Sequence, residues 1–358
     1  MQSIKATNYS IHFQQKGYEY LTDYCNEHQF SKIFILVDEH TNEYCLPIFL
    51  PNLATEIPLE IIEIEAGEHL KNIETCIELW QVLNDLGADR KSLLINVGGG
   101  VLTDLGGFIA STFKRGIPFI NVPTTLLGMV DAAIGGKNGI DFNGIKNQIG
   151  VIQPPAFVLV DTQFLETLPS NQMRSGLAEM LKHGLIFDKN YWNQLKDLSQ
   201  ITTNDLDQLI YRSIEIKNEI VCQDPTENGI RKALNFGHTL GHAIESYFLE
   251  NPDKPELLHG EAVAVGMILA SYLSVGKNTL PETDYLEISK IILNTYPKIE
   301  FTTEDISKII ELLIFDKKNE YGKVLFVLLD GIGAIKINQT IDNDLIYKAF
   351  DSYSNLTT

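Results

Sequence analysis

The chain has 358 residues, of which 44% are hydrophobic and 21% are charged, as in soluble globular proteins, and its length favours two domains. Its formal net charge of −19 and lack of a basic stripe argue against binding to nucleic acid or to an anionic membrane. The start is polar, no later run could span a bilayer and the four cysteines form no Cys-x-x-Cys pair, so we expect a cytoplasmic protein with reduced thiols.

The first half of the chain alternates between short apolar runs and one segment with helical spacing. The apolar runs end at polar residues or Gly, as buried parallel strands do, and they cover residues 32–38, 92–97, 119–122 and 156–160. Residues 73–86 have the spacing of a helix. This pattern predicts an α/β sheet domain.

The second half consists mainly of long amphipathic segments separated by polar turns. We predict helices at residues 175–187, 205–221, 232–249 and 260–275, and a hairpin strand at residues 322–329. The pattern changes near residues 165–169, so we predict one domain over residues 1–168 and a second over 169–358.

A glycine-rich turn follows the second predicted strand. Gly98, Gly99 and Gly100 would let the backbone approach a pyrophosphate, and the helix that follows would favour its negative charge. Thr103 stands where the usual dinucleotide fingerprint has Gly. A tight strand-to-helix turn without a ligand is the alternative.

Two further loops carry groups that could hold phosphate. Residues 123–127 contain two threonines after a predicted strand, and residues 131–139 are rich in Gly and contain Lys137. Lys146 and Asn147 follow shortly after. Exposed amides and ammonium groups suit a phosphate clamp, and solvated loop lysines are the alternative.

Three histidines lie close together in the second half. His238 and His242 are one helical turn apart and can share a helix face, and His259 follows near them. A third nitrogen or a carboxylate would complete a catalytic metal site with an open position. Packed or capping histidines are the alternative.

Taken in chain order, these motifs resemble the 3-dehydroquinate synthase family, from about residue 38 to residue 333. The matching segments are Gly98-Gly-Gly-Val-Leu-Thr-Asp104, Pro123-Thr-Thr-Leu-Leu127, Val130-Asp-Ala-Ala-Ile-Gly-Gly-Lys137, Lys146-Asn147, Gly176-Leu-Ala-Glu-Met-Leu-Lys182, Arg231-Lys-Ala-Leu-Asn-Phe-Gly-His238, His259-Gly-Glu-Ala262 and Asp316-Lys-Lys318.

The resemblance implies an N-terminal Rossmann-like parallel-sheet domain that binds NAD and a C-terminal, mainly α-helical domain that binds a metal. It implies a homodimer that converts 3-deoxy-D-arabino-heptulosonate 7-phosphate to 3-dehydroquinate and phosphate, a lyase reaction of the shikimate pathway in which NAD is regenerated. The metal would be zinc, with cobalt as an alternative. By the resemblance its ligands are Glu179, His238 and His259, and His242 supports the site without binding the metal.

The resemblance also divides substrate recognition between two groups of residues. The phosphate group would be held by Lys137, Asn147, one of Lys317 and Lys318, and Arg115 of the partner subunit. The carboxylate and hydroxyl groups would be held by Lys182, Lys217, Arg231 and Asn235. For Lys217 and Arg231 the alternative is surface ion pairing with nearby acids such as Glu215, Glu219 and Glu227.

For the nucleotide, the resemblance implies NAD rather than NADP, because carboxylates near the ribose would repel a 2′-phosphate. The implied nucleotide residues are Asp38, Glu68, Lys71, Gly99, Gly100, Asp104, Thr124, Thr125, Asp131, Lys137, Lys146 and Thr167.

Three positions depart from the family pattern: Thr103, Asn138 and His183 stand where Gly, Thr and Tyr are usual.

Three other functions remain open. A sugar phosphate cyclase such as 2-deoxy-scyllo-inosose synthase would share the NAD and zinc motifs but act on a substrate without a carboxylate. A metal-dependent polyol dehydrogenase would release NADH to solution. A non-catalytic metal- or nucleotide-binding protein would turn over neither kind of substrate.

Overall fold

The computed structural model describes residues 1–143, 145–196, 203–255, 257–313 and 324–357. The chain forms two compact units, Met1–Met173 and Arg174–Thr358. The boundary between them falls in the first turn of helix α6 (Ser170–Phe187), whereas the sequence prediction placed it between residues 168 and 169.

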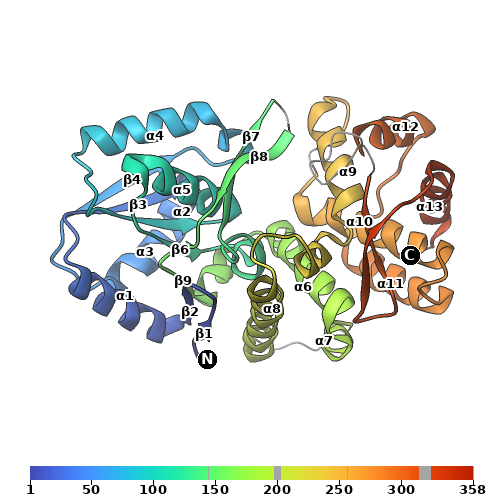
Figure 1. Ribbon diagram of the computed structural model, residues 1–358, viewed down its shortest axis with the longest axis horizontal. Helices are drawn as coiled ribbons and strands as arrows, with labels where there is room; N and C mark the ends of the chain where they lie inside the picture. Colours follow the sequence, from blue (N-terminus) through green and yellow to red (C-terminus); the bar gives the residue numbers. More distant parts are fainter. Residues whose placement is uncertain (144, 197–202, 256, 314–323, 358) are drawn as a thin grey trace. The chain divides into compact units, whose positions relative to one another are not determined.

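The first unit is built on a seven-stranded sheet in the order β1-β2-β9-β6-β5-β3-β4 (Figure 1). All neighbouring strands are parallel except β1 and β2. The four predicted strands are present as β3, β5, β6 and β9, which are adjacent in the sheet. The strands are β1 (Ile4–Lys5), β2 (Ser10–Phe13), β3 (Ile33–Asp38), β4 (Leu59–Ile64), β5 (Leu93–Gly98), β6 (Phe119–Pro123) and β9 (Phe157–Val160).

The register of the central strands brings the ends of three of them to one edge. Gly98 at the end of β5 is paired with Pro123 at the end of β6, and Asp38 ends β3 next to them in the sheet. Helices cover both faces: α4 (Ile73–Asp85) and α5 (Gly100–Thr112) lie on one, and α1 (Gln14–His28) lies on the other (Figure 1). The loops at this edge therefore stand on a rigid, buried base.

Smaller elements connect the sheet of the first unit. Among them, β7 and β8 form an antiparallel hairpin outside the main sheet, with Gly139 opposite Gly150. The connecting elements are α2 (Glu39–Tyr44), α3 (Leu46–Phe49), η1 (Leu50–Asn52), η2 (Glu68–Leu70), η3 (Phe113–Arg115), η4 (Gly128–Ala132), β7 (Lys137–Phe142), β8 (Ile145–Ile152) and η5 (Thr162–Thr167).

The second unit is mainly helical, and it contains one described hairpin, β10 (Phe326–Leu329) with β11 (Ile335–Gln339). The expected fold class is therefore confirmed. No helix in the described ranges is long and apolar enough to cross a membrane. The helices are α6 (Ser170–Phe187), α7 (Lys189–Leu195), α8 (Thr203–Gln223), η7 (Ile230–Asn235), α9 (His238–Glu250), α10 (His259–Gly276), α11 (Glu282–Thr295), α12 (Thr303–Leu312) and α13 (Asn343–Asn355).

The single helix predicted over residues 232–249 is wrong at its start. The chain makes the short turn η7, then passes through Phe236 with a ψ of 128°, and α9 begins only at His238. Gly237 has a φ of 77°, a left-handed conformation that Gly adopts without strain. This break lets His238 begin a new helix.

Candidate functional site

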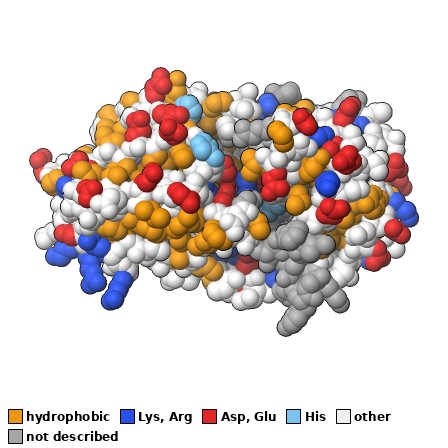
Figure 2. All heavy atoms as spheres, turned by 90° about the horizontal axis from the view of Figure 1, so that it is seen from above, with side chains coloured by type: hydrophobic (Ala, Val, Ile, Leu, Met, Phe, Trp, Pro, Cys, Tyr) orange, Lys and Arg blue, Asp and Glu red, His pale blue; other side chains and the backbone are white. Residues whose placement is uncertain are grey.

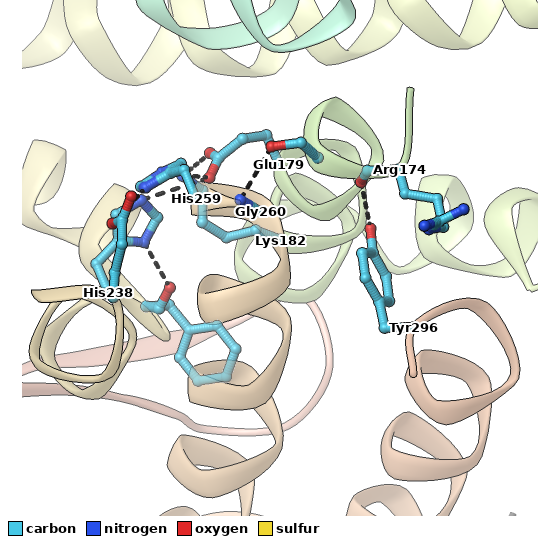
Figure 3. A network of polar contacts seen from close by, with 10 residues as sticks. Arg174, Glu179, Lys182, His238, His259, Gly260 and Tyr296 are labelled. Carbon is cyan, nitrogen blue, oxygen red and sulfur yellow. Dashed lines mark hydrogen bonds and ion pairs between the residues drawn. The ribbon is translucent and has the colours of Figure 1, made fainter. Parts of the chain in front are cut away.

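Glu179, His238 and His259 come from three different helices and point toward one another in the second unit (Figure 3). Glu179 lies within α6, and the two histidines are the first residues of α9 and α10. Glu179 Oε1 lies 3.4 Å from His238 Nε2 and 3.8 Å from His259 Nε2. A single ion placed among these three atoms could bind all of them.

A close contact between α6 and α10 places His259 beside Glu179. The amide of Gly260 donates a hydrogen bond of 3.0 Å to Ser175 Oγ. A Cβ atom on Gly260 would lie 2.1 Å from the carbonyl oxygen of Ser175, so only Gly fits here. Ser175 is one helical turn before Glu179, and the contact therefore fixes both partners of the cluster.

The second ring nitrogen of each histidine has a partner of its own. His238 Nδ1 lies 3.1 Å from the carbonyl oxygen of Phe236, and His259 Nδ1 lies 3.1 Å from Glu245 Oε2. Both partners are acceptors, so we assign the ring proton to Nδ1 in each case. The lone pairs on Nε2 then face Glu179, as metal ligands require.

Glu179 is fully buried, yet its environment favours the charged form. Burial by itself raises the pKa of this carboxyl group, but the ion pair with Lys182 and the two nearby imidazoles outweigh it and hold the pKa well below its usual range. Lys182 pairs with Oε2, whereas Oε1 accepts no hydrogen bond from the described residues. A bound cation would satisfy this buried oxygen.

His242 belongs to the same cluster and offers an alternative ligand. Its ring centre lies 5.2 Å from that of His238 and 5.6 Å from that of His259. Nitrogen atoms of the three histidines lie within 4.8 Å of one another. The two possible ligand sets thus share His238 and His259, and they differ in whether Glu179 or His242 completes them.

The predicted substrate cations of the second unit are buried. The side chains of Lys182, Lys217 and Arg231 are no more than 5% exposed, which excludes solvent-exposed surface ion pairs for Lys217 and Arg231. Arg231 Nη1 donates to the carbonyl oxygen of Pro225 over 2.6 Å, and Asn235 Nδ2 donates to Glu227 Oε1 over 2.8 Å.

In the first unit, the glycine turn lies at the end of β5 and begins α5. Gly99 is the residue before α5, and a Cβ atom on it would lie 3.0 Å from Thr125 Cγ2. The amide of Thr124 donates to the carbonyl oxygen of Gly98 over 3.0 Å. The turn and the threonine loop are therefore packed together, and a bulkier residue would block their approach.

Lys71 contacts two other predicted residues of the first unit. Its Nζ lies 2.6 Å from both Asp104 Oδ2 and Asn147 Oδ1, and its side chain is only 4% exposed. Burial lowers the pKa of Lys71, but the surrounding carboxylates, Asp104 first, outweigh it and raise the pKa. Asp141, which the sequence analysis missed, accepts a hydrogen bond from the amide of Asn147 over 2.7 Å.

Further predicted residues lie near this group, since the charges of Glu68 and Asp131 act on Asp104. Lys146 pairs with Glu68 over 3.2 Å, and Asp131 is half-buried in the turn η4. Thr167, Lys137 and Arg115 are exposed. Lys317 and Lys318 lie outside the described residues.

Comparison with known proteins finds family models that match parts of both units of the chain. The family model for the N-terminal part of 3-dehydroquinate synthase matches residues 61–175, and the model for its C-terminal part matches residues 176–319. The chain belongs to the 3-dehydroquinate synthase family.

Individual relatives agree with this membership. A 3-dehydroquinate synthase from Parabacteroides distasonis is 43% identical over 340 residues, covering 93% of this chain and 94% of the relative. One from Streptococcus pyogenes is 36% identical over 351 residues, covering 97% of each.

Solved structures of related cyclases share the fold. A 2-deoxy-scyllo-inosose synthase complexed with carbaglucose-6-phosphate, NAD+ and Co2+ is 25% identical, with a TM-score of 0.83 over 98% of this chain and 99% of that one. A 2-epi-5-epi-valiolone synthase from Streptomyces hygroscopicus with NAD+ and Zn2+ bound is 26% identical, with a TM-score of 0.84 over 99% of each chain.

The three departures from the usual 3-dehydroquinate synthase pattern are all buried and hydrogen-bonded. Thr103 Oγ1 donates to the carbonyl oxygen of Gly100, and Asn138 Nδ2 donates to the carbonyl oxygens of Gly136 and Gln153. His183 Nδ1 lies 2.7 Å from Ser213 Oγ. These side chains are thus accommodated locally in this member of the 3-dehydroquinate synthase family.

Proposed function

We propose that this protein converts 3-deoxy-D-arabino-heptulosonate 7-phosphate to 3-dehydroquinate and phosphate, with NAD and a zinc ion, and with cobalt as an alternative metal. Membership of the 3-dehydroquinate synthase family supports the reaction. The observation that carries the proposal is the buried Oε1 of Glu179, which faces two imidazole Nε2 atoms.

The donor atoms suit zinc. Two imidazole nitrogens and one carboxylate oxygen are a ligand set of catalytic zinc sites, and they leave a position open for substrate. When bound, zinc would lower the pKa of a substrate hydroxyl group, and NAD would supply a reversible acceptor for hydride. We propose Glu179, His238 and His259 as the ligands, with His242 as a supporting residue.

The buried cations of the second unit would bind the carboxylate end of the substrate. We assign this role to Lys182, Lys217 and Arg231, and we assign neighbouring hydroxyl groups to Asn235. The planar guanidinium of Arg231 matches a carboxylate, and Pro225 already fixes its orientation through a hydrogen bond. Lys182 also pairs with Glu179, so it would hold that ligand in its charged form.

The loops of the first unit would bind NAD and the substrate phosphate. Gly99 and Gly100 at the start of α5 would let backbone amides approach the pyrophosphate. Asp38 at the end of β3 would accept hydrogen bonds from a ribose. Lys137 and Asn147 would hold the phosphate group, joined by Lys317 or Lys318, and the remaining implied residues would line the nucleotide site.

The proposed homodimer has support in the surface of the first unit. Figure 2 shows hydrophobic side chains across the face that carries α4 and the β7–β8 hairpin. Exposed hydrophobic residues of these elements include Ile77, Phe142, Ile145, Ile149 and Ile152. An apolar patch on a protein surface often marks a contact with another chain.

The loop that carries Arg115 also suits a dimer. Lys114 and Arg115 have φ values of 48° and 72°, and such left-handed conformations are strained in residues other than Gly. The strained turn holds Arg115 exposed, from where it could reach the phosphate site of a partner subunit.

The cytoplasmic location remains a prediction of the sequence.

An assay of 3-dehydroquinate formation tests the reaction. Zinc-loaded protein should form 3-dehydroquinate and release phosphate, lose both activities with a chelator, and leave glucose 6-phosphate unchanged. Turnover of glucose 6-phosphate would instead support the inosose synthase alternative. Steady release of NADH on addition of glycerol would support a polyol dehydrogenase, and an absence of any turnover would leave only a binding protein.

The substitution Arg231→Ala separates the two binding functions. It should abolish turnover while leaving NAD affinity nearly unchanged, because the residues proposed for NAD lie in the other unit. Equal loss of turnover and NAD binding would mean that the substitution disrupts folding.

A further inference from the structure

Glu245 lies next to the candidate metal ligands but is not one of them. It belongs to α9, it is 4% exposed, and its Oε2 lies 3.1 Å from His259 Nδ1. We propose that Glu245 is a positioning residue that fixes which nitrogen of His259 faces the metal and strengthens its binding. This inference rests on the proposed function, because it takes His259 to be a ligand.

The tautomer of His259 decides whether it can bind a metal here. A neutral imidazole carries its proton on only one nitrogen, and the other nitrogen holds the lone pair. The carboxylate of Glu245 can only accept, so it places the proton on Nδ1 and leaves the lone pair on Nε2. That nitrogen is the one that faces Glu179 Oε1, 3.8 Å away.

His238 has a different partner for the same purpose. Its Nδ1 lies 3.1 Å from the carbonyl oxygen of Phe236, a neutral backbone group close in sequence. His259 depends instead on a charged side chain from another helix. A carboxylate partner also raises the electron-donating strength of an imidazole ligand, so Glu245 should contribute more than orientation.

The close packing of α9 against α10 brings the side chain of Glu245 within hydrogen-bond distance of His259. A Cβ atom on Gly241 would lie 3.1 Å from both the carbonyl oxygen of Ala262 and the Cα atom of Val263. The two helix backbones are therefore in close contact one turn before Glu245 and one turn after His259. A buried carboxylate is costly unless it accepts hydrogen bonds, and the imidazole of His259 donates one from Nδ1.

The test compares Glu245→Gln with wild type and with Glu250→Gln. Glu250 is in the same helix but exposed, so its substitution makes the same chemical change away from the site. Zinc affinity is measured on the full-length protein by competition with a chromophoric chelator at fixed pH. We expect Glu245→Gln to bind zinc roughly 10- to 100-fold more weakly, the usual cost of losing such a partner, and Glu250→Gln to match wild type.

Two further measurements separate positioning from folding. Urea unfolding of the metal-free variants should show similar stability, and the ¹⁵N NMR shifts of His259 should show its proton on Nδ1 in wild type and redistributed in Glu245→Gln. Glu245→Asp, which keeps the charge on a shorter side chain, should recover part of the affinity. Unchanged zinc affinity and an unchanged tautomer in Glu245→Gln would overturn the proposal.

The outcome for Glu245 is distinguishable from that for the proposed function. If wild type binds zinc and forms 3-dehydroquinate while Glu245→Gln binds zinc equally well, only the positioning role is wrong. If wild type binds no zinc, or if His259→Ala binds zinc as well as wild type, the metal site and the role of Glu245 are both wrong.

Discussion

The carbonyl oxygen of Gly237 lies 2.0 Å from the point where a Cβ atom on Gly266 would stand. Helices α9 and α10 thus touch backbone to backbone at this pair. His238 follows Gly237 directly, so the contact holds a candidate metal ligand against α10. His238 can take this position because Gly266, seven residues after His259 in α10, has no side chain.

We therefore predict that Gly266→Ala separates the two helices. The added methyl group meets backbone rather than a flexible side chain, so the free energy of unfolding should fall by about 1–3 kcal/mol. Zinc affinity should fall with it. The control is Gly276→Ala in the same helix, whose methyl group would first meet the flexible side chain of Leu345. Urea unfolding measures the stability of the two variants, and equal stabilities would contradict the packing argument.

The buried pair of Lys71 and Asp104 yields a second prediction. Lys71→Met leaves the partly buried carboxylate of Asp104 without its cation, which should cost about 1–3 kcal/mol of unfolding free energy. It also removes the hydrogen bond that holds the side chain of Asn147. Urea unfolding and NAD titration measure the two effects.

A double-mutant cycle isolates the ion pair. Asp104→Asn in the Lys71→Met background removes the uncompensated charge. The double variant should therefore lose less unfolding free energy than the two single variants lose in sum. Additive losses would show that the two side chains do not interact in solution.

A third prediction concerns acid stability and Asp305. Its Oδ2 accepts a hydrogen bond of 2.7 Å from Lys254, and its Oδ1 accepts one of 2.6 Å from Tyr247. Burial favours the neutral form, but these hydrogen bonds, with those from Thr302, outweigh it and lower the pKa of Asp305 to about 2.

Since the folded protein binds this proton less tightly than the unfolded chain, the stabilisation is complete above the ordinary pKa of 3.8 and is lost as the pH falls toward 2. Asp305→Asn should thus reduce the unfolding free energy by about 1–2 kcal/mol at pH 7, and the difference should shrink between pH 4 and pH 2. Denaturant unfolding at several pH values checks this. A difference that is constant with pH would contradict the assignment.

The fourth prediction tests Glu179 against His242 as the third metal ligand. Glu179→Gln should lower zinc content and activity strongly, whereas His242→Ala should retain the metal while losing activity. Metal analysis after dialysis measures this. Retention of zinc by Glu179→Gln together with its loss from His242→Ala would favour the three-histidine set.

The centre of the first unit could be predicted from the sequence because its strands are buried on both faces. Residues 32–38 and 92–97 are uninterrupted apolar runs, and they form β3 and β5. Strand β4 was missed because it lies at the sheet edge, where exposed Ile61 and Glu63 obscure the apolar pattern. The start of α9 was misplaced because periodicity does not register the left-handed turn at Gly237.

The candidate site was predictable to different degrees. Helical spacing brought His238 and His242 together, but Glu179 lies on another helix, and only the family resemblance pointed to it. Glu245 could have been found, because it follows His238 by seven residues and so lies on the same face of α9. Ser175 gave no signal, since its role arises from a tertiary contact with Gly260.

All three proposed ligands, and the carboxylate that orients one of them, belong to the second unit, whereas the glycine turn proposed for the nucleotide belongs to the first. Loading of the ion would then require no dinucleotide, and the ion would stay in place while NAD exchanges with solvent. Apoenzyme stripped of NAD should accordingly keep its zinc through repeated washing, and the order of cofactor addition should not change the final activity.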